Sequence, residues 1–159
     1  MLPIKTILHP TDFSPQAEYA YQLARSLARD YGARLLLQHV EEISPAVYGE
    51  FGALSVDPED VHESLKEKLH RLEPEGVGEV NYFLVRGDPA SEIVALANNY
   101  PCDVIIMGTH GRKGLARLLM GSVAENVARH APCPVVTVKS PLTPANVGME
   151  AEEQFAPVI

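Results

Sequence analysis

"MGTHGRKGLARLLMGSVAENV", Met107–Val127, joins an apolar segment to an expected helix, and four glycines lie within its first fifteen residues. Glycine costs backbone entropy, so such a loop needs either positive φ angles or close approach by another group. The spacing is Gly108-x-x-Gly111, nine further residues, then Gly121-Ser122. It matches neither the G-x-x-x-x-G-K-S/T loop, because no Lys precedes Ser122, nor a G-x-G-x-x-G turn after the first strand.

This glycine-rich loop has the features of an anion site. Glycines let backbone N–H groups face an anion with no Cβ in the way. The helix expected after Gly121 would add free N–H groups and the positive end of its dipole. Arg112, Lys113 and Arg117 add positive charge in a chain of net charge −8. These features predict a polyphosphate site, although a solvent-exposed loop face would equally explain Arg112 and Lys113.

Outward from this loop, short apolar segments alternate with amphipathic ones. The expected strands are Ile4–Pro10, Ala33–Val40, Glu79–Val85, Cys102–Gly108 and Pro134–Val138. The expected helices follow Ser14-Pro15, Asp57-Pro58 and Asp88-Pro89, with a fourth at about Val123–His130. The first should bury Ala20, Leu23, Ala24, Leu27 and Ala28, and should end at Gly32. This alternation predicts an α/β fold, with an open doubly wound five-stranded parallel sheet and helices on both faces.

The charge, the length of the apolar runs and the cysteine count argue against several classes of protein. With 21 acidic and 13 basic residues, the chain is a poor partner for nucleic acid or an anionic membrane. No apolar run approaches the roughly 20 residues that span a bilayer, and the N-terminus lacks a signal-peptide pattern. Two cysteines, Cys102 and Cys133, make no disulfide framework and indicate a cytoplasmic protein. Both cysteines enter neighbouring strands from the same edge of the sheet, so they could lie close together, and we expect them to be reduced thiols in the core.

Two stretches lack the pattern of a packed element. Residues 41–56 are long for a connection and could form a lid. Residues 141–159 hold three Glu and no Lys or Arg, so we expect an acidic C-terminal tail, flexible or docked on a partner subunit. The expected organisation is therefore one domain, residues 1–140, followed by this tail.

Several segments resemble the universal stress protein family. They are "HPTDFS" after the first strand, "HV" at the end of the second, "CDVIIMGTHGRKGL" and "LLMGSVAENVARHAPCPVVTVK". The resemblance implies the strand order 3-2-1-4-5 of the adenine nucleotide alpha hydrolase-like fold. Members with the full glycine pattern typically bind ATP, and this chain keeps every glycine of it. ATP, with Mg²⁺, is therefore the expected cofactor.

The resemblance also implies which residues hold the nucleotide. Asp12 would contact the adenosine part, and the backbone of Val40 would read the adenine edge. Met107 would lie under the ribose, and the hydroxyl of Ser122 would contact a terminal phosphate. The full set of candidate nucleotide-binding residues is Pro10, Thr11, Asp12, Val40, Met107, Gly108, His110, Gly111, Arg112, Gly121, Ser122 and Val123.

Other interpretations of these residues stay open. Ser122 with Glu125 three residues later also makes a capping box, and Asp12 could be only a turn residue. His110 could simply be exposed. His9 and His39 lie near strand ends, where a satisfied histidine is the default, and no group of histidines has metal-ligand spacing.

Three functions are compatible with the sequence. The first is an ATP-binding regulator or sensor that reports stress or nucleotide state to a partner protein. The second is a slow ATPase or phosphotransferase, although no general base can be placed near the terminal phosphate. The third is an interaction module that needs no nucleotide. The family resemblance also implies a homodimer through the fifth strand (Pro134, Val135, Val136, Val138), or a higher oligomer.

Overall fold

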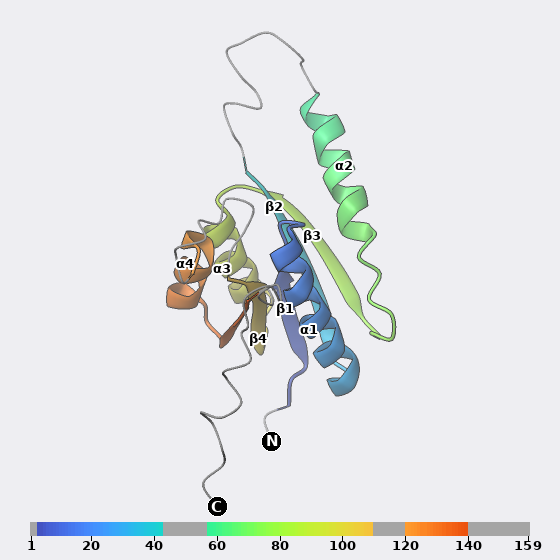
Figure 1. The fold of residues 1–159 in the computed structure, drawn as a ribbon, viewed down its shortest axis with the longest axis vertical. Helices are drawn as coiled ribbons and strands as arrows, with labels where there is room; N and C mark the ends of the chain where they lie inside the picture. The colour runs from blue at the N-terminus through green and yellow to red at the C-terminus, as the bar shows by residue number, and fades with distance from the viewer. Residues whose placement is uncertain (1–2, 43–56, 110–119, 140–159) are drawn as a thin grey trace, which may run out of the picture.

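The fold is a parallel sheet between two layers of helices (Figure 1). The computed structural model describes residues 3–42, 57–109 and 120–139. The sheet is five-stranded and ordered β3-β2-β1-β4-β5, with every pairing parallel. The strands are β1 (Thr6–Pro10), β2 (Arg34–Glu41), β3 (Val80–Arg86), β4 (Val104–Gly108) and β5 (Val135–Val138). The helices are α1 (Pro15–Tyr31), α2 (Pro58–His70), α3 (Pro89–Asn99) and α4 (Ser122–His130). The predicted fold class and strand order are confirmed.

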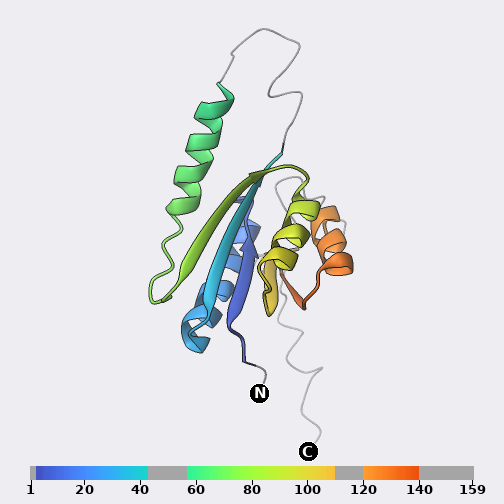
Figure 2. The ribbon, with the colours of Figure 1, turned by 180° about the vertical axis from the view of Figure 1, so that it is seen from behind.

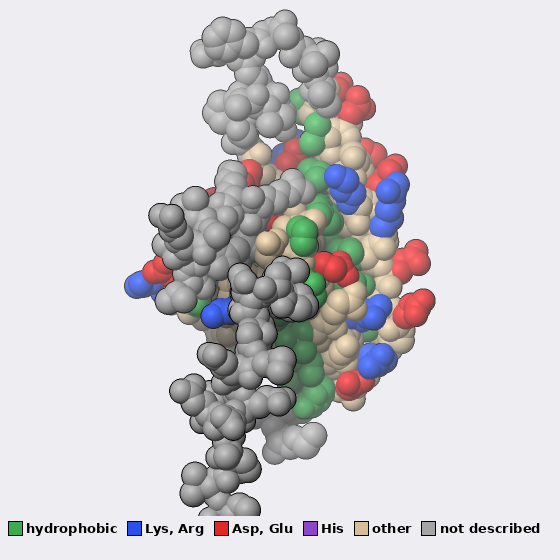
Figure 3. Space-filling model, viewed as in Figure 1, with side chains coloured by type: hydrophobic (Ala, Val, Ile, Leu, Met, Phe, Trp, Pro, Cys, Tyr) green, Lys and Arg blue, Asp and Glu red, His purple; other side chains and the backbone are tan. Residues whose placement is uncertain are grey.

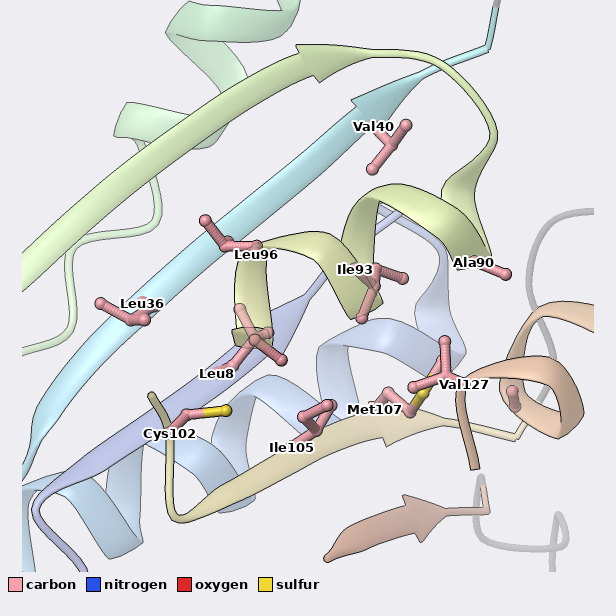
Figure 4. Close-up of a cluster of buried hydrophobic side chains, with 12 residues drawn as sticks. Leu8, Leu36, Val40, Ala90, Ile93, Leu96, Cys102, Ile105, Met107 and Val127 are labelled. Atoms are coloured by element: carbon pink, nitrogen blue, oxygen red, sulfur yellow. The ribbon is translucent and has the colours of Figure 1, made fainter. Parts of the chain in front are cut away.

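Each face of the sheet has its own apolar core. Helices α1 and α2 lie on one face, where Ile7, Leu35 and Ile106 pack with helix residues such as Ala24 and Leu69. Helices α3 and α4 lie on the other face, as the reverse view in Figure 2 makes plain. Their core includes Leu8, Leu36, Ile93, Ile105 and Val127 (Figure 4). Strands covered on both faces need apolar side chains in both directions, which explains their continuous apolar sequences.

The helices start in two different ways. In α1, α2 and α3, the residues Ser14, Asp57 and Asp88 are side-chain caps, and each is followed by Pro. Pro suits the first helical position because its missing N–H would have no partner there. Helix α4 instead has Gly121 at its cap position and no side-chain cap hydrogen bond. Among the described residues, no side chain therefore caps the start of α4, where the sequence predicts an anion.

Some predicted boundaries and core positions were wrong. Strand β1 starts at Thr6 rather than Ile4, because the Asp103 carboxylate accepts the N–H groups of Lys5 and Thr6 at 2.7 and 2.9 Å. In α1 the buried stripe is Ala17, Ala20, Tyr21, Ala24 and Ala28. Leu23 is exposed because Tyr21, not Leu23, turns its side chain onto the sheet.

Charged side chains of both signs are interspersed over the face that α1 and α2 cover (Figure 3). No helix in the described ranges is long and apolar enough to cross a membrane. The expected lid falls mostly on residues 43–56, and the expected tail on residues 141–159. Both lie outside the described residues, as do His110, Gly111, Arg112, Lys113 and Arg117.

Candidate functional site

The turn after β1 is fixed by two local hydrogen bonds. The Thr11 hydroxyl accepts the N–H of Phe13 at 3.1 Å, and the Asp12 carboxylate accepts the N–H of Ser14 at 3.0 Å. Phe13 has a φ of 60°, which is uncommon for a residue other than glycine and costs free energy. Asp12 therefore stabilises this turn, which is one of the two roles expected for it. The same bond fixes the Asp12 carboxylate at the end of β1.

His39 of β2 holds this turn in place over the sheet. Its Nδ1–H donates to the Thr11 carbonyl at 2.7 Å, and its ring lies 4.5 Å from the ring of Phe13, centroid to centroid. The N–H of Thr11 in turn donates to the Gln38 carbonyl at 2.8 Å. These long-range contacts offset the strain at Phe13. Neither Phe13 nor His39 was among the predicted site residues.

Val40 lies beyond the last residue of β2 that pairs with β1, since that ladder ends at Pro10 and Gln38. Gln38 directs its backbone toward β1, where its carbonyl accepts from Thr11. In a parallel ladder, a residue directs both its N–H and its C=O toward one neighbour, and alternate residues share that direction. Val40 therefore directs one donor and one acceptor toward the space beyond the end of β1.

The end of β4 is tied to the start of α4 by Thr109. The Thr109 N–H donates to the Val138 carbonyl at 3.0 Å, and the Thr109 carbonyl accepts from the Gly121 N–H at 2.7 Å. Gly121 is thereby held directly beyond β4. Thr109 is buried, and the sequence interpretation missed it because its partners are distant along the chain.

Helix α4 begins at Ser122, with Gly121 as the residue before it. Ser122 is therefore the first helical residue rather than the cap, and its side chain is exposed. The Glu125 carboxylate pairs with Arg129 at 2.8 Å, while the Glu125 N–H donates to the Gly121 carbonyl. The capping-box interpretation of Ser122 and Glu125 is wrong. Val123 is half-buried in the first turn.

The side chains of Val40 and Met107 belong to the core between the sheet, α3 and α4. In Figure 4 the Met107 side chain lies toward Val127 of α4, and Val40 lies on the same side of the sheet as Ile93. A ligand at this edge would therefore meet the backbone of Val40 and Met107 rather than their side chains. Gly108 ends β4 beside Val138 of β5.

His9 is the titratable side chain of β1, and burial shifts its pKa strongly. It is fully buried, and its Nδ1–H donates to the Ile106 carbonyl at 2.8 Å. Burial lowers the pKa of His9 from 6.5 to about 4, opposed by that hydrogen bond and by the charge of Asp12. Its Nε2 has no hydrogen-bond partner in the described part of the chain. His9 is therefore neutral near pH 7 and is a structural residue.

These residues meet at one edge of the sheet. The carboxyl ends of β2, β1 and β4 are adjacent there, and the chain order reverses between β1 and β4. In open α/β sheets, ligands bind at such a switch point. The geometry brings together Pro10, Thr11, Asp12, Val40, Met107, Gly108, Gly121, Ser122 and Val123. The described residues contain no group of His, Cys, Asp and Glu that could hold a metal ion.

Comparison with solved structures points to the same fold. The structure of the protein MJ0577 aligns with a TM-score of 0.76 and 32% identity, over 89% of this chain and 100% of that one. A universal stress protein solved in complex with cAMP aligns with a TM-score of 0.62 and 25% identity, over 86% of this chain and 98% of that one.

Sequence comparison identifies the family. Universal stress protein MJ0531 of Methanocaldococcus jannaschii is 37% identical over 142 residues, covering 86% of this chain and 83% of that protein. Universal stress protein MJ0577 of the same organism is 35% identical over 154 residues, covering 85% and 94%. The model of the universal stress protein family matches residues 3–139. With this match over nearly the whole described fold, the chain belongs to the universal stress protein family.

Proposed function

We propose that this protein binds ATP at the carboxyl edge of β2, β1 and β4 and acts as a nucleotide-dependent regulator. The observation that carries the proposal is the backbone of Val40, which faces the space beyond β1 at the sheet's switch point. A second polar feature, the start of α4 with glycine at its cap position, lies at the same edge. The related protein solved in complex with cAMP supports an adenine nucleotide as the class of ligand.

The base would lie against the end of β2. Val40 offers one N–H and one C=O, which suit the N1 acceptor and the amino donor of adenine. The Asp12 carboxylate, fixed by Ser14 at 3.0 Å, would accept hydrogen bonds from the ribose hydroxyl groups. The backbone of Met107 and Gly108 would lie beneath the sugar.

The phosphates would lie at the start of α4. The first four N–H groups of a helix have no partner within it, and its dipole favours negative charge there. In α4 the first of them, that of Gly121, donates to Thr109, so the N–H groups of Ser122, Val123 and Ala124 would face the phosphates. Gly121 has no Cβ to obstruct them, and its φ of −74° and ψ of 157° are ordinary for any residue. Positive φ therefore does not explain this glycine, whereas close approach by a phosphate does, alongside the capping tendency of glycine. Gly111 and Arg112 would complete the phosphate site, with Mg²⁺ as counter-ion.

This function can be tested directly by identifying any nucleotide that stays bound to the protein through expression and purification. We expect protein denatured immediately after purification to release ATP at close to one equivalent per chain, which supports the regulator. Release of ADP, together with steady phosphate production from added ATP, would indicate an ATPase instead. If no nucleotide is released and added ATP with Mg²⁺ leaves the melting temperature unchanged, the protein does not depend on nucleotide and the proposal is wrong.

We predict that ATP binds more tightly than GTP. Guanine presents a donor at N1 and an acceptor at O6, so against Val40 it would leave a buried polar group unpaired. Such a group costs about 1–3 kcal/mol, which corresponds to a preference on the order of 10-fold to 100-fold for ATP. Competitive calorimetric titration of both nucleotides measures this ratio. Equal dissociation constants would remove Val40 as the base-reading residue.

The proposed assembly is a cytoplasmic homodimer through β5. This strand lies at the edge of the sheet, and Val136 is 39% exposed on it. An apolar edge strand is normally paired or covered, and pairing with its twofold copy would use Pro134, Val135, Val136 and Val138.

Val136→Lys is therefore expected to weaken the dimer, because a twofold axis repeats the new charge opposite itself. Light scattering at micromolar concentration should show a dimeric wild type and a largely monomeric variant. Phe155, Val158 and Ile159 could instead cover this edge from within the same chain. A monomeric wild type that dimerises when residues 141–159 are deleted would contradict the proposed interface.

A further inference from the structure

The chain's two cysteines lie together at the opposite end of β4 from the candidate nucleotide site. Cys102 precedes β4 and Cys133 precedes β5, and their Sγ atoms are 3.3 Å apart with a hydrogen bond between the thiols. Figure 4 shows Cys102 and Met107 near opposite ends of β4. Because the pair lies at the far end of β4 from the candidate nucleotide site, its role is a separate question.

The backbone that follows each cysteine is held by regular sheet structure. Ile105 pairs with Val135, and the Ile105 N–H donates to the Pro134 carbonyl at 2.9 Å. Disulfides span Cα separations of about 4.4–6.8 Å, and the 3.3 Å between the two Sγ atoms shows that the backbones already bring these side chains together. Prolines on both sides of Cys133, at 132 and 134, restrict its backbone further. The two sulfurs therefore lie within bonding reach after a small side-chain movement.

We propose that Cys102 and Cys133 form a reversible dithiol–disulfide site that is oxidised by low-molecular-weight disulfides. Cys133, which is half-buried, is reached first, while Cys102 is buried. The Cys133 thiolate attacks the small disulfide, forms a mixed disulfide and releases one thiolate. Cys102 loses its proton to solvent and attacks the Cys133 sulfur, which releases the second thiolate. In total, two protein thiols and one small disulfide give one protein disulfide and two small thiols.

The electrostatics set the order and the pace of these steps. Burial, together with the hydrogen bond to Cys133, raises the pKa of Cys102 to about 12. Burial also raises the pKa of Cys133, but the thiol of Cys102 opposes this by stabilising the Cys133 thiolate. Cys133 is therefore the better first nucleophile. Because the thiolate is the reactive form, oxidation should be slow near pH 7 and faster as the pH rises.

The Cys102–Cys133 disulfide would close a loop of the chain. The segment from Cys102 to Cys133 contains β4 and α4, and so also Met107, Gly108 and Gly121. A cross-link stabilises mainly by restricting the unfolded chain, so the oxidised protein should melt at a higher temperature. The redox site itself does not rest on the proposed nucleotide binding.

The test uses the full chain, equilibrated with mixtures of reduced and oxidised glutathione and then quenched with acid and alkylated. We expect intact-mass analysis to show the loss of two hydrogens without a glutathione adduct, in monomeric chains, and full reversal by dithiothreitol. Peptide mapping should find Cys102 joined to Cys133. Persistence of both thiols under fully oxidising conditions would overturn the proposal, as would a lasting glutathione adduct or a disulfide between chains.

Two single-cysteine variants serve as controls. Cys102→Ala should stop at a mixed disulfide on Cys133, because no second thiol remains. Cys133→Ala should react at least several-fold more slowly, because Cys102 is the more buried thiol. Equal rates for the two variants would contradict the assigned order. Phenylarsine oxide tests proximity without an oxidant, since it bridges two adjacent thiols with loss of water. Wild-type protein that does not bind it would also contradict the site.

Discussion

Gly121→Val is expected to reduce ATP affinity by at least about 100-fold while leaving the fold intact. The new side chain would occupy the path by which phosphate oxygens reach the N–H groups at the start of α4. Two lost hydrogen bonds to a charged group, at about 1.5–3 kcal/mol each, account for a change of this size. The backbone is compatible with Val, because Gly121 has a φ of −74° and a ψ of 157°. The cost in stability should be limited to about 1 kcal/mol, because Val is a poorer helix cap than Gly.

Gly78→Val is the matched control for this experiment. Gly78 precedes β3, and a Cβ added there meets nothing within 4 Å. Both variants should give native circular dichroism, and calorimetric titration should find wild-type affinity only in Gly78→Val. A well-folded Gly121→Val protein that bound ATP as tightly as wild type would remove the start of α4 from the phosphate site.

The second large effect concerns His9 and stability in acid. The pKa of His9 is about 4 in the folded protein, against 6.5 for an unperturbed histidine. Between these values the unfolded chain binds a proton that the folded protein does not, so stability falls as the pH drops. The stability that this pKa shift contributes is fully present above about pH 6.5. As the pH falls toward 4, the free energy of unfolding decreases progressively, by about 3 kcal/mol in total.

Comparison with His9→Asn isolates this contribution. The Asn amide does not titrate, and it retains an N–H donor for the Ile106 carbonyl, which accepts from His9 at 2.8 Å. Urea unfolding at pH 8 and pH 5 should show that wild type loses about 2 kcal/mol more than the variant over this interval. Identical pH dependence of the two proteins would mean that His9 titrates normally in the fold.

The sequence allowed the fold to be predicted because its signals were local and repeated. Pro follows Ser14, Asp57 and Asp88, and each of these residues is the cap of a helix. Continuous apolar strands indicated a sheet buried on both faces, which the two cores confirm. The strand order came from the family resemblance. The start of β1 was wrong because it depends on the Asp103 carboxylate, a contact between distant residues.

The candidate site was predicted only in part, for the same reason. The glycine pattern indicated Gly121 from its spacing, and the two possible reasons for a glycine there could not be separated until its φ was known. Thr109 positions Gly121 through backbone hydrogen bonds to Val138 and Gly121. His39 holds the turn after β1 through its hydrogen bond to Thr11, next to Phe13 with its φ of 60°. Local sequence patterns do not predict such hydrogen bonds between distant residues.

The central claim is that the carboxyl edge of this sheet binds ATP. It is tested most directly by calorimetric titration of the wild-type chain, stripped of nucleotide by unfolding and refolding, with ATP and Mg²⁺. We predict saturable binding of one ATP per chain, competed by adenosine and lost in Gly121→Val. Refolded protein with native circular dichroism that gives no binding heat and no change in melting temperature with ATP would contradict the account.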